Sequence, residues 1–127
     1  MKILRAYWKS ILTAMLIIYG CLIRQPHYHW PPIQQGDKWA HLLAFCLLAI
    51  VLVYDLHKAQ QANLRTISFA TIAAILLGTA IEILQYLFFY PRTGEWSDWL
   101  ADCIGIAIGL SIATIWKTIY RHTHLPS

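Results

Sequence analysis

Residues 66–90 read TISFATIAAILLGTAIEILQYLFFY, a run of 25 residues in which Glu82 is the only acidic or basic side chain. An α-helix rises about 1.5 Å per residue, so about 20 mostly apolar residues cross the roughly 30 Å hydrocarbon core of a bilayer. Pro91 follows the run directly and is expected to end the helix. The stretch therefore predicts a transmembrane helix with one acid inside it.

Three further apolar runs predict transmembrane helices at about residues 8–23, 38–56 and 98–116. Prolines and glycine break the chain before the second run, and a Gln- and Asn-rich stretch, 57–65, follows it. The 127 residues are 58% hydrophobic and 13% charged, with a mean hydropathy of +0.51. We therefore predict an all-α membrane protein, with residues 1–127 forming one domain, a four-helix transmembrane bundle.

Basic residues near the ends of the spans indicate how the chain is oriented, because Lys and Arg are enriched on the cytoplasmic side. Seven fall on the side of both termini and three on the other side: Lys2, Arg5, Lys9, Lys58, Arg65, Lys117 and Arg121, against Arg24, Lys38 and Arg92. Both termini are therefore predicted to be cytoplasmic, and the first and third loops are predicted to face outward.

Two features exclude other classes of protein. The net charge of +4 does not indicate a nucleic-acid binder, because Lys and Arg lie at segment ends rather than along one face. Cys21, Cys46 and Cys103 stand apart in apolar stretches without metal-ligand spacing. We expect these cysteines to behave as small buried hydrophobes, and we expect no nucleic-acid partner.

Polar and ionisable residues gather toward one side of the predicted membrane. Such residues cost about 2.5 to 3.5 kcal/mol each at a helix centre, so they usually mark a function. The predicted binding residues all belong to the outer leaflet or surface: Asp37, Lys38, His41, Glu82, Gln85, Arg92, Asp98 and Asp102. Helical rise places His41, Gln85 and Asp102 about one turn below the rim and Glu82 deepest. We expect an outward-opening polar pocket with Glu82 at its floor.

Glycines at four-residue spacing predict close helix packing. Gly105 and Gly109 continue the face of Asp102, and Gly78 lies four residues before Glu82. Small residues at this spacing let helix backbones approach closely in lipid. We therefore expect the third and fourth helices to pack tightly against each other.

The polar residues and their spacing resemble those of the VanZ-like membrane protein family. The resemblance lies in three motifs between residues 36 and 109: Asp37-Lys38-x-x-His41-x-x-x-Phe45, Glu82-x-x-Gln85 followed by Pro91-Arg92, and Ser97-Asp98-x-x-x-Asp102-x-x-Gly105-x-x-x-Gly109. The resemblance implies a four-helix protein of the bacterial cytoplasmic (inner) membrane. VanZ itself is associated with resistance to the glycopeptide antibiotic teicoplanin, most relatives lack an assigned reaction, and many carry Asn where this chain has Asp102.

Three functions remain open from the sequence. The pocket can bind the headgroup of an envelope lipid, a cell-wall precursor or a related glycopeptide-type ligand, with Lys38 and Arg92 engaging phosphate or carboxylate. Alternatively, His41 or Glu82 is the general base of an enzyme acting on an envelope lipid. In the third, the polar residues only hold the helices together. We favour binding over catalysis, with membrane lipids as partners.

No cofactor or metal is predicted. His41 with Glu82, Asp98 and Asp102 would offer the imidazole and carboxylate ligands that suit zinc. No HExxH motif or paired-histidine spacing accompanies them. Transport is also disfavoured, because Asp55 is the one acid in the inner halves of the predicted helices.

Overall fold

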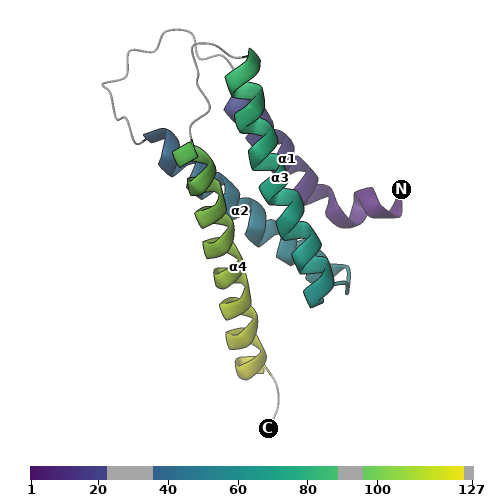
Figure 1. Ribbon diagram of the computed structural model, residues 1–127. Coiled ribbons are helices and arrows are strands. Elements are labelled where there is room, and N and C mark those ends of the chain that lie inside the picture. The colour runs from purple at the N-terminus through teal and green to yellow at the C-terminus, as the bar shows by residue number, and fades with distance from the viewer. Residues whose placement is uncertain (23–35, 89–95, 125–127) are drawn as a thin grey trace.

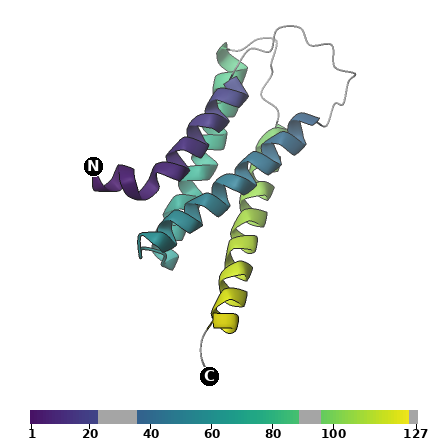
Figure 2. The ribbon, with the colours of Figure 1, turned by 180° about the vertical axis from the view of Figure 1, so that it is seen from behind.

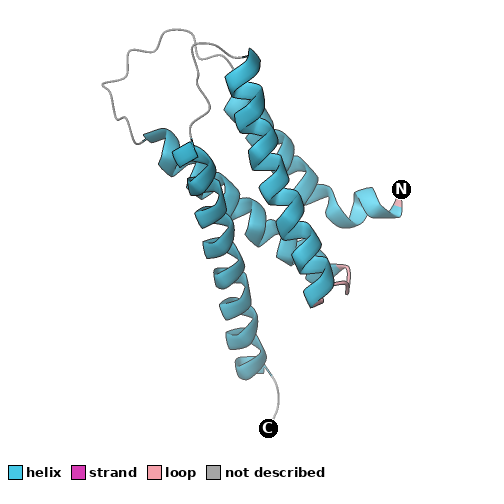
Figure 3. Cartoon of the chain, viewed as in Figure 1, coloured by secondary structure: helices cyan, strands magenta, loops and turns pink. Residues whose placement is uncertain are grey.

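The computed structural model describes residues 1–22, 36–88 and 96–124, apart from the side chains of 36, 37 and 124. All regular structure in this part of the chain is helical (Figure 3). The helices are α1 (Lys2–Leu22), α2 (Gly36–Lys58), α3 (Leu64–Phe88) and α4 (Trp96–His124). The predicted all-α architecture with four helices is therefore confirmed for the described residues.

Three of these helices are long and apolar enough to cross a membrane. The candidate spans are Lys38–Lys58 in α2, Leu64–Phe88 in α3 and Trp96–Thr123 in α4. Over its described residues α1 does not reach the same hydropathy, because basic residues occupy its first half. The composition of α2, α3 and α4 is thus that of a membrane protein, and the fourth predicted span, in α1, stays a prediction.

The helices alternate in direction, so that two ends of the bundle can be distinguished (Figures 1 and 2). We call the end where α2 and α4 begin and α1 and α3 finish the site end. The opposite end holds the N-terminus, the connection from α2 to α3 and the last turns of α4 (Figure 1). Figure 2 shows α2 and α4 crossing near the site end and separating toward the opposite end.

Two glycines of α4 explain how closely this helix approaches α2. A Cβ added at Gly105 would lie 2.3 Å from the carbonyl oxygen of Leu42, and one at Gly109 would lie 2.4 Å from that of Cys46. No side chain fits in that space, so the two backbones are in direct contact. The expectation that these glycines pack α4 against α3 is therefore wrong: their partner is α2.

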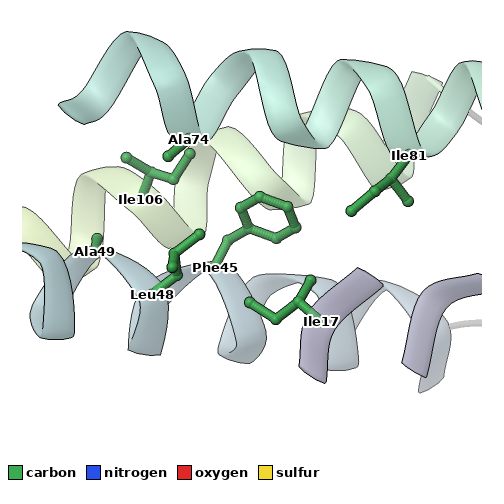
Figure 4. Packing of buried hydrophobic residues seen from close by; sticks show 7 residues of the cluster. All are labelled: Ile17, Phe45, Leu48, Ala49, Ala74, Ile81 and Ile106. Atoms are coloured by element: carbon green, nitrogen blue, oxygen red, sulfur yellow. The ribbon is translucent and has the colours of Figure 1, made fainter. Parts of the chain in front are cut away.

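Buried apolar side chains from all four helices fill the centre of the bundle (Figure 4). Phe45 is fully buried, and its ring points from α2 toward α3 in the middle of the cluster (Figure 4). The other members of this cluster are Ile17, Leu48, Ala49, Ala74, Ile81 and Ile106. This packing fixes the starts of α2 and α4 and the last turns of α3 relative to one another.

A bend in α1 is stabilised by a buried acid of α2 at the opposite end. Tyr7 has a non-helical backbone (φ −114°, ψ 18°), and the first residues of α1 turn away from the rest of the helix there (Figure 1). The helix restarts after Tyr7, so its first N–H groups need acceptors outside the helix. Asp55, only 1% exposed, accepts hydrogen bonds from the Ser10 N–H at 3.0 Å and the Ser10 hydroxyl at 2.7 Å.

Candidate functional site

Three helices each contribute one ionisable side chain to a compact group at the site end. His41 lies in the second turn of α2, Glu82 near the end of α3, and Asp102 in the second turn of α4. Nδ1 of His41 is 2.9 Å from Oδ1 of Asp102 and 3.8 Å from Oε1 of Glu82. One atom from each residue lies within 4.8 Å of the other two. We call these three residues the His–Glu–Asp cluster.

The cluster is buried inside the bundle. The exposed fraction is 4% for His41, 9% for Glu82 and 1% for Asp102. Buried charges are expensive unless they are paired, and the imidazole next to both carboxylates lowers the cost of burying them. The second carboxylate oxygen of Asp102, Oδ2, has no hydrogen-bond partner within the described part of the chain.

A glycine of α3 makes room for that oxygen. A Cβ at Gly78 would lie 2.9 Å from Oδ2 of Asp102, closer than van der Waals contact allows. Gly78 is one helical turn before Glu82, so Asp102 faces the stretch of α3 that also presents Glu82. The absence of a side chain at Gly78 is therefore what lets α4 bring its acid against α3.

Three further polar contacts surround the cluster. Asp98 is buried in the first turn of α4, where the helix dipole favours a negative charge, and it is near enough to His41 to interact with it electrostatically. The side-chain amide of Gln85 donates to the carbonyl oxygen of Cys21 at 2.8 Å, which ties α3 to the end of α1. Trp99 Nε1 donates to the Thr79 hydroxyl at 3.0 Å and ties α4 to α3.

A groove of about 720 Å³ runs between α3 and α4 beside the cluster. We call it the α3–α4 groove; it is lined by Thr79, Glu82, Ile83, Tyr86, Leu87, Trp96 and Trp99. The rings of Trp96 and Trp99 meet edge to face, with their centroids 5.8 Å apart. The described walls are thus mostly apolar and aromatic, with the carboxylate of Glu82 among them.

A family model described as VanZ/LLP1 matches residues 2–117 of the chain. The chain belongs to the VanZ/LLP1 family. The match includes every member of the His–Glu–Asp cluster and all residues that line the groove, so the resemblance drawn from the sequence motifs is confirmed. Comparisons with curated proteins and with solved structures give no match.

The structure of this VanZ-family chain brings together part of the predicted binding set. His41, Glu82 and Asp102 meet directly, and Asp98 lies close by. Gln85 instead bonds the backbone of α1, and Lys38 is half-buried at the start of α2. The side chain of Asp37 and the whole of Arg92 lie outside the described residues.

The character of the site differs from the open polar pocket that the sequence predicts. The described acids and the histidine are buried, and the neighbouring groove is mostly apolar. Depth along each helix can be read from residue number, but the sequence does not show that Asp102 contacts His41 or that Glu82 lies next to both. The result is a buried ionisable cluster beside a groove.

Sequence reasoning also passed over two contacts. Asp55 is more than an inner-surface acid, because it binds Ser10 across 45 residues. A single acid inside an otherwise apolar run was the available signal. The Trp99–Thr79 bond had no comparable signal, since tryptophans near the ends of spans usually serve as interface anchors.

Proposed function

We propose that this VanZ-family protein binds an amphiphilic lipid of the bacterial envelope, or a lipid-linked cell-wall precursor, in the α3–α4 groove. Apolar walls that include one carboxylate, next to a buried ionisable cluster, are the observation that carries this proposal. We place the protein in the bacterial cytoplasmic membrane as a four-span bundle, with α1 included and both termini cytoplasmic. The site end then faces outward, in agreement with the excess of basic residues at the opposite end.

The groove suits the chain of an amphiphile. Its volume of about 720 Å³ falls in the range of about 300 to 1,000 Å³ that is usual for small-molecule sites. Ile83, Leu87 and Trp96 offer it an apolar surface, and all three are largely exposed on the protein itself. A lipid chain lying there shields these side chains in the same way as bulk lipid does, so affinity must come from the polar part of the ligand.

Glu82 gives the groove its polar specificity. An ionised carboxylate accepts hydrogen bonds, so it favours a headgroup that carries hydroxyl or amine groups. Lys38 and Arg92 remain our candidates for binding the phosphate of such a headgroup. Both are basic, and the sequence places both at the predicted outer rim. The proposed ligand therefore combines an acyl or prenyl chain, a phosphate and a hydroxyl- or amine-bearing group.

The proposal can be tested by filling the groove. We expect Ile83→Trp to lower lipid retention at least tenfold, because the larger ring occupies space between α3 and α4. Leu76→Trp is the matched control: Leu76 is exposed on the same helix but does not line the groove. Native mass spectrometry of the detergent-purified protein would be run with phosphatidylethanolamine, phosphatidylglycerol and a polyprenyl diphosphate sugar as separate probes.

The wild type and Leu76→Trp should each retain one molecule of a preferred probe, and Ile83→Trp should retain at least tenfold less. Glu82→Gln should weaken the preference among headgroups, although the variant should still retain some lipid. Equal retention by Ile83→Trp and the wild type would contradict the proposal.

A second candidate function, acid–base chemistry on an envelope lipid, is favoured by the contact between His41 and Asp102. An imidazole whose Nδ1 is held by a carboxylate has its tautomer and orientation fixed, as the base in a catalytic triad does. In this alternative His41 or Glu82 accepts a proton from the substrate. Turnover of a lipid by the purified protein would support it, and full activity in the double variant His41→Ala/Glu82→Gln would exclude it.

A further inference from the structure

We infer that the His–Glu–Asp cluster is a binding site for a divalent cation of the zinc type. Spacing along the sequence gives no sign of such a site, because the three donors come from three different helices. Folding brings an imidazole nitrogen and two carboxylates to within 4.8 Å of one another. Mixed imidazole and carboxylate donors favour zinc and related ions over magnesium or calcium, which prefer oxygen ligands alone.

The distances between the donors fit one ion held by all three. Zinc lies about 2.0 to 2.2 Å from nitrogen and oxygen ligands, so the ligands of a tetrahedral site are about 3.4 Å apart. Nδ1 of His41 lies 2.9 Å from Asp102 and 3.8 Å from Glu82, values on either side of this separation. Shifts of a few tenths of an ångström would bring both of these pairs to that separation, and the donors of Glu82 and Asp102 lie within 4.8 Å of each other.

The charge and burial of the donors point the same way. Two ionised carboxylates and a neutral imidazole balance the charge of a divalent cation. Asp102 is 1% exposed, and its Oδ2 has no hydrogen-bond partner within the described residues, so the carboxylate retains an unused acceptor next to α3. When the metal displaces the Nδ1 proton of an imidazolium, the ring that remains is a neutral imidazole with its Nε2 proton, so binding of the ion to the protonated cluster releases one proton.

Three protein ligands leave one position of a tetrahedral ion open. Structural zinc sites use four protein ligands, whereas sites that act on a bound molecule use three and keep the fourth for water or a ligand. Because Glu82 also lines the α3–α4 groove, a phosphate in that groove is within reach of such an ion. This last step rests on the proposed function, whereas binding of the ion does not.

The experiment measures metal binding without any lipid. The full-length protein is purified in detergent, stripped with a chelator and titrated with Zn²⁺ while its thermal unfolding is followed. Co²⁺ is then used as a spectroscopic probe, because its visible bands report tetrahedral coordination and the presence of thiolate ligands. We expect one ion per chain, a higher unfolding temperature, no thiolate-to-cobalt band, and affinity that rises as pH increases.

Nearly isosteric variants distinguish ion binding at the His–Glu–Asp cluster from ion binding elsewhere on the protein. Glu82→Gln and Asp102→Asn keep the shape of the side chains and should each weaken Zn²⁺ binding by more than about 100-fold, beyond the 10- to 100-fold effect of losing an outer-shell partner. Asp55→Asn, which changes a buried acid at the opposite end, should leave affinity unchanged. A triple variant with serine at Cys21, Cys46 and Cys103 should also bind as the wild type does.

Two results would overturn the inference. One is the absence of any Zn²⁺ or Co²⁺ binding to the folded wild type at micromolar concentrations. The other is affinity in Glu82→Gln and Asp102→Asn equal to that of the wild type, which would assign the ion to another part of the chain. Because no lipid is present, neither result depends on whether the α3–α4 groove binds a lipid.

Discussion

Each end of the bundle buries acidic side chains, but the two ends use them differently. At the opposite end, Asp55 accepts two hydrogen bonds from Ser10, one of them from the backbone N–H where α1 restarts after its bend. At the site end, Glu82 and Asp102 share one histidine, and one oxygen of Asp102 is left without a hydrogen bond from the described residues.

The comparison shows that burial alone does not identify a functional acid. Asp55 and Asp102 are equally buried at 1% exposed, yet the fold accounts fully for Asp55, because α1 needs an acceptor where it bends. Nothing in the local helix geometry requires two carboxylates around His41. We therefore interpret the acid at the opposite end as structural and the cluster at the site end as a site for a ligand.

The largest effect is expected from His41→Ala. Removal of the imidazole leaves two buried carboxylates facing each other, and loss of one partner of a buried pair costs about 3 to 5 kcal/mol. The free energy of unfolding can be measured by titration with SDS in mixed micelles. His57→Ala, at the other end of the same helix and half-exposed, is the control and should cost less than about 1 kcal/mol. If His41→Ala and His57→Ala lowered the free energy of unfolding equally, the two ends would not differ as we describe.

A smaller loss of unfolding free energy is expected from Asp55→Ala. It leaves the Ser10 N–H and hydroxyl without their acceptor, which we expect to cost about 2 to 3 kcal/mol, since a buried unsatisfied donor costs about 1 to 3. Because the role of Asp55 is structural, ligand binding by the folded fraction should be unchanged. A stable Asp55→Ala protein that has lost lipid or Zn²⁺ binding would show that the opposite end also belongs to the site.

The smallest effect is expected at the helix crossing that positions the cluster. Gly105→Ala places a Cβ 2.3 Å from a backbone carbonyl of α2, so the upper end of the overpacking range, about 3 kcal/mol, applies; alanine favours the helix by about 1, which leaves a cost of about 2 kcal/mol. By moving α4 away from α2 it should also weaken ligand binding. Gly20→Ala is the control, because nothing lies within 4 Å of that Cβ. The free energy of unfolding and the Zn²⁺ affinity are measured for both variants. Equal values for Gly105→Ala and Gly20→Ala would contradict the prediction.

Much of the fold could be predicted from the sequence because membrane helices follow from composition and length. The run around Glu82 and the prolines and glycines between runs were sufficient to place the helices. The partner of each helix could not be predicted in this way. Gly105 and Gly109 indicate a close contact, but a small-residue face does not specify which neighbour it meets, and here the neighbour is α2.

The residues of the candidate site could be predicted from the sequence, but the way their side chains face one another could not. Residue numbers place His41 and Asp102 at similar depths and Glu82 somewhat deeper on the same side of the membrane, because the rise of a helix is fixed. Whether these side chains face water, lipid or one another depends on the rotation of each helix about its axis. That rotation is set by packing around Phe45 and at Gly78, which only the folded chain shows.

A double-mutant cycle between His41 and Asp102 tests the central claim, that these residues of different helices act as one buried unit. The unfolding free energies of His41→Ala, Asp102→Ala and the double variant should be non-additive by at least about 1 kcal/mol. The same cycle between His41 and Asp55, which are about 20 Å apart along α2, should be additive within about 0.5 kcal/mol. Additivity between His41 and Asp102 would contradict the account.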